Sequence, residues 1–267
     1  MPFAFIGIFL AFRSGYAFDS WKLILVVLCM VFARNAAMGF NRYLDRAIDA
    51  QNNRTKQREI PAGVIPASNA LYFVLFNCAA FLLTTWFINL LCFFLAPVAL
   101  LVILGYSYTK RFTALCHLVL GLGLSLAPIG AWLAVAETFA LAPVVLGFAV
   151  LTWVSGFDII YALQDRTFDQ SLKLHSIPVW LGEIRAMWFS RFLHLLSFAS
   201  ILSFGFLTQG NWSYWIASAF YGIMLVYQHT LVKPGDLSRV NIAFMTVNGI
   251  VSVVFASIVI GGWMLIG

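Results

Sequence analysis

The sequence predicts an all-α protein, a polytopic membrane helix bundle of about nine transmembrane helices. Hydrophobic residues make up 62% of the 267 residues and charged residues only 10%, whereas about a quarter of a soluble protein is charged. Apolar segments recur along the whole chain, so one secretory signal does not account for the hydrophobicity. A water-soluble domain and a disordered chain are both excluded.

Glycine, proline, asparagine and charged residues divide the chain into nine apolar segments. The expected helices are 1–12, 20–49, 67–87, 90–108, 112–135, 139–163, 184–208, 212–232 and 237–266. The first would be about 18 Å long, too short for a hydrocarbon core of about 30 Å, so we expect it to be truncated, either because the true start lies upstream or because the sequence is a fragment. Residues 1–267 should form a single integral-membrane domain, built from two pseudo-repeats of four helices plus one.

The basic residues predict the orientation of the bundle. Most of the 16 lysines and arginines lie in the loops after the second, fourth, sixth and eighth helices, and none follows the third, fifth or seventh. Short loops rich in positive charge stay in the cytoplasm. We therefore expect a cytoplasmic amino terminus and, for a bacterial protein, the inner membrane. The net charge of +6 indicates topology and attraction of anionic ligands, with no nucleic-acid partner.

Two acidic segments share the pattern Asp-Arg-x-x-Asp. Asp45 and Asp49 end the second helix, and Asp165 and Asp169 end the sixth, each displaced by the same number of residues. Each copy lies at the expected cytoplasmic end of its helix, before a polar loop at about residues 50–66 or 170–183. An even number of helices separates the copies, so the internal repeat is parallel, unlike the inverted repeats common in transporters.

Helical spacing predicts one acidic stripe in each segment. The second segment places three carboxylates within about 40° of one another on a helix: Asp158, Asp165 and Asp169. The first spreads three oxygen-bearing side chains over about 80°: Asn41, Asp45 and Asp49. Facing stripes of like charge need a cation between them, and such ligands suit Mg²⁺ bridging to phosphate. Nearby basic residues would complement a diphosphate: Arg54, Arg58, Lys110, Arg111 and Lys173.

A metal–diphosphate site beside a membrane cavity fits a lipidic diphosphate, whose tail can lie in the bilayer. Ionisation of an allylic diphosphate needs a neutralised leaving group, aromatic faces for the carbocation and exclusion of water. The chain has 26 Phe, 9 Trp and 9 Tyr to supply such faces. The four cysteines lie in apolar stretches and indicate neither a disulfide framework nor a zinc site, and the four histidines show no metal spacing and are interpreted as structural or interfacial.

Four segments resemble the UbiA superfamily of intramembrane prenyltransferases. They are Asn-x-x-x-Asp-x-x-x-Asp at 41–49, Asp-x-x-Tyr-x-x-x-Asp-x-x-x-Asp at 158–169, Arg-Glu-Ile-Pro-Ala-Gly at 58–63 and Tyr-Ser-Tyr-Thr-Lys-Arg at 106–111. The resemblance covers nearly the whole chain and is strongest to the 4-hydroxybenzoate polyprenyltransferase branch. It implies a nine-helix bundle with a cytoplasm-facing cavity. The implied activity is Mg²⁺-dependent prenylation of 4-hydroxybenzoate meta to its carboxylate, from polyprenyl diphosphate, in ubiquinone biosynthesis.

The resemblance also implies residue roles. The expected metal ligands are Asn41, Asp45, Asp49, Asp158, Asp165 and Asp169. The expected diphosphate contacts are Asn41, Arg54, Arg58, Lys110 and Lys173. The expected catalytic residues are Asp45, Asp165, Asp169 and Arg111, of which Arg111 would hold the aromatic carboxylate. The expected partners are the two substrates and membrane lipid, with no obligate protein partner evident.

One departure and three alternatives accompany this prediction. Arg42 stands where many family members have Asp, which removes one possible ligand. A cation transporter could also use intramembrane carboxylates, but it has no need of two strongly basic loops beside them. A phosphoalcohol transferase would carry two Asp followed by Gly, a pattern missing here. Within the family, a carboxynaphthoate-type acceptor for menaquinone is the alternative to 4-hydroxybenzoate.

Overall fold

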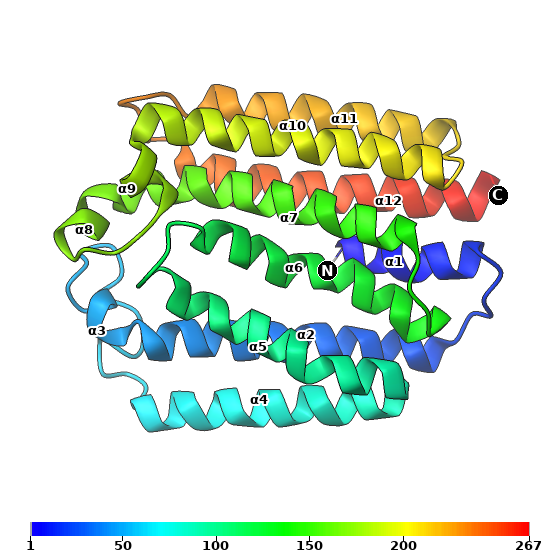
Figure 1. Cartoon of the computed structure of the whole chain (residues 1–267), viewed down its shortest axis with the longest axis horizontal. Coiled ribbons are helices and arrows are strands. Elements are labelled where there is room, and N and C mark those ends of the chain that lie inside the picture. Colours follow the sequence, from blue (N-terminus) through cyan, green and yellow to red (C-terminus); the bar gives the residue numbers. More distant parts are fainter. Residues whose placement is uncertain (1, 267) are drawn as a thin grey trace.

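The computed structural model describes residues 2–266, which form a bundle of helices aligned along one axis (Figure 1). The long helices are α2 (Ser20–Leu44), α4 (Ala67–Ile88), α5 (Leu90–Thr109), α6 (Cys116–Ala136), α7 (Leu141–Ala162), α10 (Glu183–Leu207), α11 (Trp212–Leu231) and α12 (Asn248–Ile266). The shorter elements are α1 (Pro2–Arg13), α3 (Arg46–Asp49), the 3₁₀ turn η1 (Leu163–Asp165), α8 (Arg166–Ser171), α9 (Ile177–Leu181) and the π-helical segment η2 (Ile242–Val247).

All nine apolar segments that the sequence predicts contain a helix, and the all-α membrane bundle is confirmed. Seven helical segments are long and apolar enough to cross a bilayer. The helix α1 has only 12 residues, and α11 is 20 residues long but carries Ser, Tyr, Gln and His along its length. The count of nine crossings stays a prediction.

Close contacts between helix backbones hold the bundle together where glycine removes a side chain. A Cβ atom on Gly121 of α6 would lie 2.4 Å from the carbonyl oxygen of Leu151 in α7. A Cβ atom on Gly7 of α1 would lie 2.4 Å from the carbonyl oxygen of Pro128 in α6. Small residues let apolar helices approach closely in a membrane, where packing replaces the hydrophobic effect as the driving force.

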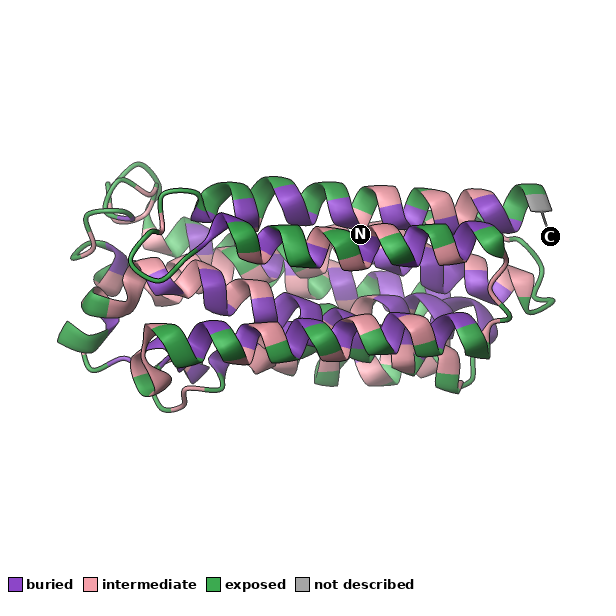
Figure 2. Cartoon of the chain, turned by 90° about the horizontal axis from the view of Figure 1, so that it is seen from above, coloured by how far each residue is buried: buried purple, intermediate pink, exposed green. Residues whose placement is uncertain are grey.

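The outer surface of the bundle is apolar. Buried and exposed residues alternate along the helices (Figure 2), and the exposed ones include large hydrophobic side chains: Phe94, Leu101 and Phe206 are at least 70% exposed. A soluble protein does not expose so much contiguous apolar surface. This surface therefore faces lipid, and the protein is an integral membrane protein.

Three short helices gather at one end of the bundle. The elements α3, α8 and α9 lie together at the left of Figure 1, beyond the ends of α2 and α7. The two acidic segments of the sequence lie in this group, because α3 ends at Asp49 and α8 contains Asp169. The fold thus brings both copies of the repeat to the same end of the molecule.

Candidate active site

The two copies of Asp-Arg-x-x-Asp have the same backbone form. Asp45 lies at the junction between α2 and α3, with φ −89° and ψ 7°. Asp165 lies at the junction between η1 and α8, with φ −97° and ψ 2°. Both residues occupy the bridge region of backbone space, which is sparsely populated and common at active sites. The second carboxylate of each copy, on Asp49 or Asp169, is buried.

The expected continuous helix is wrong in both segments, although all six residues of the two expected acidic stripes line one cavity. The expected helix 20–49 ends at Leu44, and α7 ends at Ala162 before a 3₁₀ turn. The spacing of 100° per residue does not apply across these breaks. The carboxylates of both segments face the same cavity because the two broken helices end beside each other.

A polar cavity of about 230 Å³ lies between these helix ends. Nine of the residues that the sequence singles out line it: Asn41, Asp45, Asp49, Arg54, Arg58, Lys110, Asp158, Asp165 and Asp169. They come from α2, α3, α7, η1, α8 and the loops after α3 and α5. The structure therefore brings most of the predicted site residues together, although their chemical roles stay predictions.

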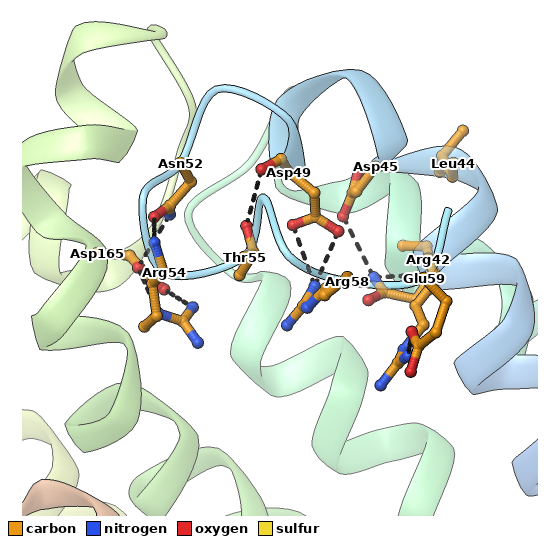
Figure 3. A network of polar contacts seen from close by, with 12 residues as sticks. Arg42, Leu44, Asp45, Asp49, Asn52, Arg54, Thr55, Arg58, Glu59 and Asp165 are labelled. Carbon is orange, nitrogen blue, oxygen red and sulfur yellow. Dashed lines mark hydrogen bonds and ion pairs between the residues drawn. The ribbon is translucent and has the colours of Figure 1, made fainter. Parts of the chain in front are cut away.

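Arginines of the loop after α3 pair with carboxylates of both repeats (Figure 3). Arg54 donates through Nε to Oδ1 of Asp165 at 3.1 Å, and its Nη2 contacts the other oxygen. Asn52 of the same loop donates to Oδ1 of Asp165 at 3.3 Å. Arg58 donates to both oxygens of Asp49, at 3.0 and 2.9 Å. One loop therefore joins the two repeats.

The remaining carboxylates of the cavity also face a basic side chain. Lys110 Nζ lies 2.7 Å from Oδ1 of Asp169. Burial lowers the pKa of Lys110, but the carboxylate of Asp169 outweighs burial, so the pKa is raised and the ammonium keeps its charge. At Asp45 burial raises the carboxyl pKa, against the opposing effect of Arg111. The carboxylates of the site are held in charged pairs.

The oxygen-bearing side chains of the cavity are suitable ligands for a hard cation such as Mg²⁺, although most of them are paired with basic side chains in this structure. Among residues 2–266, no three His, Cys, Asp or Glu side chains stand close enough to hold a metal ion jointly. Asp169, however, is fully buried, and although its Oδ1 lies 2.7 Å from Lys110 Nζ, its Oδ2 has no partner among the described residues. Buried carboxylate oxygens normally find partners, so Asp169 keeps free coordination capacity of the kind that Mg²⁺ uses.

Two predicted residues lie beside the cavity but do not line it. Arg111 Nη2 donates to the carbonyl oxygen of Leu44 at 3.0 Å and contacts Asp45 Oδ1 at 3.3 Å, so it caps the end of α2. Lys173 lies after α8 in a left-handed conformation with φ 55° and forms no ion pair within the described chain. Arg42, which stands where many family members have Asp, pairs with Glu59.

The structure adds site residues that sequence reasoning missed. His117 lines the cavity, and its Nδ1 lies 2.7 Å from Oδ2 of Asp158, whereas the sequence indicated a structural or interfacial role. Tyr161 also lines it and accepts a hydrogen bond from Arg54 at 3.1 Å. Tyr161 could have been singled out, because it is the tyrosine of the 158–169 motif. Nothing in the sequence pairs His117 with Asp158, 41 residues away.

Comparison with known proteins identifies this arrangement. The UbiA prenyltransferase family matches residues 1–250 of the chain. The chain belongs to the UbiA prenyltransferase family. Among curated relatives, the 4-hydroxybenzoate octaprenyltransferase of Vibrio cholerae is 31% identical over 92% of this chain and 86% of its own length. The enzyme of the same name from Nitrosomonas europaea is 32% identical, over 91% of this chain and 82% of its own length.

Solved structures of UbiA homologues share the fold. The apo structure of a UbiA homolog from Aeropyrum pernix K1 superposes with a TM-score of 0.86, at 28% identity, and covers 99% of this chain and 95% of that one. A UbiA homolog from Archaeoglobus fulgidus, solved bound to DMAPP and Mg²⁺, has a TM-score of 0.73 at 17% identity, with 99% and 97% covered. The UbiA bundle is therefore confirmed, and the chain is a prenyltransferase of this family.

Proposed function

We propose that this UbiA-family enzyme transfers a polyprenyl group from polyprenyl diphosphate to 4-hydroxybenzoate, at the ring carbon meta to the carboxylate, and that it depends on Mg²⁺. The observation that carries the proposal is the cavity in which carboxylates of both repeats alternate with basic side chains. The curated relatives named 4-hydroxybenzoate octaprenyltransferase support the choice of acceptor. The Archaeoglobus fulgidus homologue that binds Mg²⁺ and a prenyl diphosphate supports the choice of donor and metal.

The ion pairs of the cavity have the charges that a magnesium diphosphate needs. Three cations, on Arg54, Arg58 and Lys110, each hold one carboxylate. Diphosphate oxygens can take the place of those carboxylates on the cations, with charge-assisted hydrogen bonds to the guanidinium groups. The freed carboxylates then become available to the metal. Substrate binding would thus exchange one set of ion pairs for another without leaving a buried charge unpaired.

The carboxylates of both repeats would hold the metal. The proposed ligands are Asn41, Asp45, Asp49, Asp158, Asp165 and Asp169. When bound, Mg²⁺ neutralises the charge that develops on the leaving diphosphate. Within the chain, Arg58 and Lys110 would stabilise the same developing charge once the exchange of ion pairs has placed them on the diphosphate.

Aromatic side chains and Arg111 would position the two organic groups. Tyr106, Tyr161 and Phe168 line the cavity and can offer ring faces to an allylic carbocation. Arg111 would hold the benzoate carboxylate in a bidentate pair, which requires it to leave the carbonyl of Leu44. A cavity carboxylate or the released diphosphate then accepts the ring proton. Lys173, outside the cavity, would contact the diphosphate only after movement of its loop.

A product assay by mass spectrometry tests the proposal. Detergent-purified protein receives a long-chain prenyl diphosphate with either 4-hydroxybenzoate or a carboxynaphthoate, in Mg²⁺ or in EDTA. We expect a prenylated hydroxybenzoate in Mg²⁺ and none in EDTA. Preference for the naphthoate would instead assign the enzyme to menaquinone biosynthesis. Equal amounts of product in EDTA and in Mg²⁺ would contradict the proposed metal dependence. Transport of Mg²⁺ or protons without any prenylated product would contradict the proposed enzymatic activity.

A further inference from the structure

A second cavity lies between α10 and α11 and shares no residue with the active-site cavity. Its volume is about 770 Å³. The residues that line it, called here the α10–α11 groove, are Arg191, His194, Leu195, Phe198, Ala219, Gly222, Ile223, Leu225, Val226, His229 and Thr230. Several of the apolar ones are more than half exposed, among them Leu195, Ile223 and Val226. The groove therefore opens toward lipid.

The polar residues of the groove lie at one end. The helices α10 and α11 run side by side in opposite directions (Figure 1), so Arg191 near the start of α10 lies at the same end as Thr230 near the end of α11. At this end the amide of Gly235 donates to Oε1 of Glu183 at 2.7 Å, beside α9 and the active-site end of the bundle. From Val226 back to Ala219 the α11 side of the groove is apolar over about 10 Å of helix.

Arg191 is a cation without an acidic partner. It forms no ion pair with any residue between 2 and 266, and its guanidinium lies over the Trp188 ring at 4.6 Å. Tryptophan and arginine side by side are typical of the membrane–water interface. A basic residue between two membrane helices at that depth complements a lipid phosphate.

At the same end of the groove, a pair of histidines leaves one ring nitrogen without a hydrogen-bond partner in the described chain. His194 Nε2 must donate to the carbonyl oxygen of Trp153 at 3.2 Å, because a carbonyl only accepts. In a neutral ring His194 Nδ1 then accepts from His229 Nε2 at 2.8 Å. This leaves His229 Nδ1 as an acceptor, buried and without a partner in the described chain. This acceptor needs a donor such as a hydroxyl of a lipid headgroup, and the protein alone does not supply one.

We propose that the α10–α11 groove binds one anionic phospholipid, with its phosphate at Arg191, beside Thr230, and an acyl chain along the apolar wall. The single cation of the groove matches a phosphodiester with one charge. A prenyl diphosphate carries more charge and would lack the carboxylates and additional cations that the active-site cavity provides. The inference therefore does not depend on the proposed function.

The test measures phospholipid binding by native mass spectrometry, supported by thermal unfolding in detergent with added lipid. The lipids are phosphatidylglycerol and phosphatidylcholine of the same acyl composition. We expect wild-type protein to bind phosphatidylglycerol more tightly, and Arg191→Gln to lower that affinity about tenfold, the usual loss of a charge-assisted contact. Arg185→Gln is the matched control, since it removes the same charge from an exposed position of α10 outside the groove.

A second variant tests the acyl chain. Ala219→Phe fills the apolar end of the groove from an exposed position without changing charge, and we expect a loss of affinity similar to that of Arg191→Gln. Equal binding of the two lipids, or equal losses in Arg191→Gln and Arg185→Gln, would overturn the proposal. Unchanged affinity in Ala219→Phe would overturn it too, as would displacement of the lipid by glycerol 3-phosphate or by geranyl diphosphate.

Discussion

At the scale of single residues, the site is a set of carboxylates each matched to one basic side chain. Asp165 pairs with Arg54, Asp49 with Arg58 and Asp169 with Lys110. Charges at this depth are costly unless they are paired. The pairing explains why the acidic residues can converge before any substrate arrives.

Replacing either junction carboxylate should abolish most turnover. Asp45→Asn and Asp165→Asn each keep the shape of the side chain but remove a negative charge from the proposed metal site. We expect the rate to fall by about 100-fold or more, measured by product formation across a Mg²⁺ titration. Asp19→Asn is the control, because Asp19 only caps α2 and Asn caps a helix equally well. Wild-type turnover in either junction variant would contradict the two-repeat site.

His117 should act through Asp158. Its Nδ1 holds the Asp158 carboxylate at 2.7 Å, and partners of this kind orient proposed metal ligands. We expect His117→Leu to raise the Mg²⁺ concentration for half-maximal rate by about 10-fold or more, with a smaller effect on the rate at saturating Mg²⁺. His117→Asn, whose amide nitrogen can replace Nδ1, should restore much of the affinity. If the half-maximal Mg²⁺ concentration of both variants equals that of the wild type, His117 serves only in packing.

At the scale of elements, the breaks at the ends of α2 and α7 orient the carboxylates of the site. The ends of α2 and α7 are followed by α3 and by η1 with α8, and each break turns the chain so that the second Asp is buried. The π-helical segment before α12 has a related effect, because it places the carbonyl oxygen of Ala243 where Gln228 donates to it at 3.0 Å. It also stacks Phe244 on Tyr161, with ring centroids 4.0 Å apart, so η2 supports the cavity wall.

The contact between α6 and α7 should be sensitive to one methyl group. Gly121→Ala would drive a Cβ into the backbone of Leu151 and the Ser155 hydroxyl, and we expect a loss of about 1–3 kcal/mol in unfolding free energy, as for other overpacked interiors. Gly130→Ala, in the same helix, meets nothing within 4 Å and should be neutral or slightly stabilising. Reversible unfolding in mixed micelles measures both. Equal stability of the two variants would show that α6 can shift without cost.

At the scale of the whole molecule, the cavity opens at the end of the bundle that carries the basic loops, which we expect to face the cytoplasm. Single cysteines in a background without the four native ones test this orientation. Lys56→Cys at the cavity end should react with an impermeant maleimide only in inverted vesicles, and Gln209→Cys at the opposite end only in right-side-out ones. The reverse labelling pattern would place the active site on the outer face.

Much of the fold could be predicted because hydropathy is a local property. Twenty apolar residues become a membrane helix wherever they occur, so the all-α class and the nine helical segments follow from composition and spacing. The membership in the UbiA family and the convergence of both Asp motifs also follow, since the motifs lie at fixed positions relative to the helix ends. The exact end of each helix does not follow: Asp45 lies within a run of helix-compatible residues, and only packing decides that the chain turns there.

The sequence by itself determined the class of protein, the helices and the acidic residues of the site. Tertiary structure alone decided which basic side chain pairs with which carboxylate. Arg54 contacts Asp165, 111 residues away in the sequence, and His117 contacts Asp158, 41 residues away. It also decided that Arg111 lies outside the cavity, bound to the carbonyl of Leu44. Periodicity describes one helix at a time, whereas ion pairs form between helices, where distance in space sets the energy and distance in sequence does not.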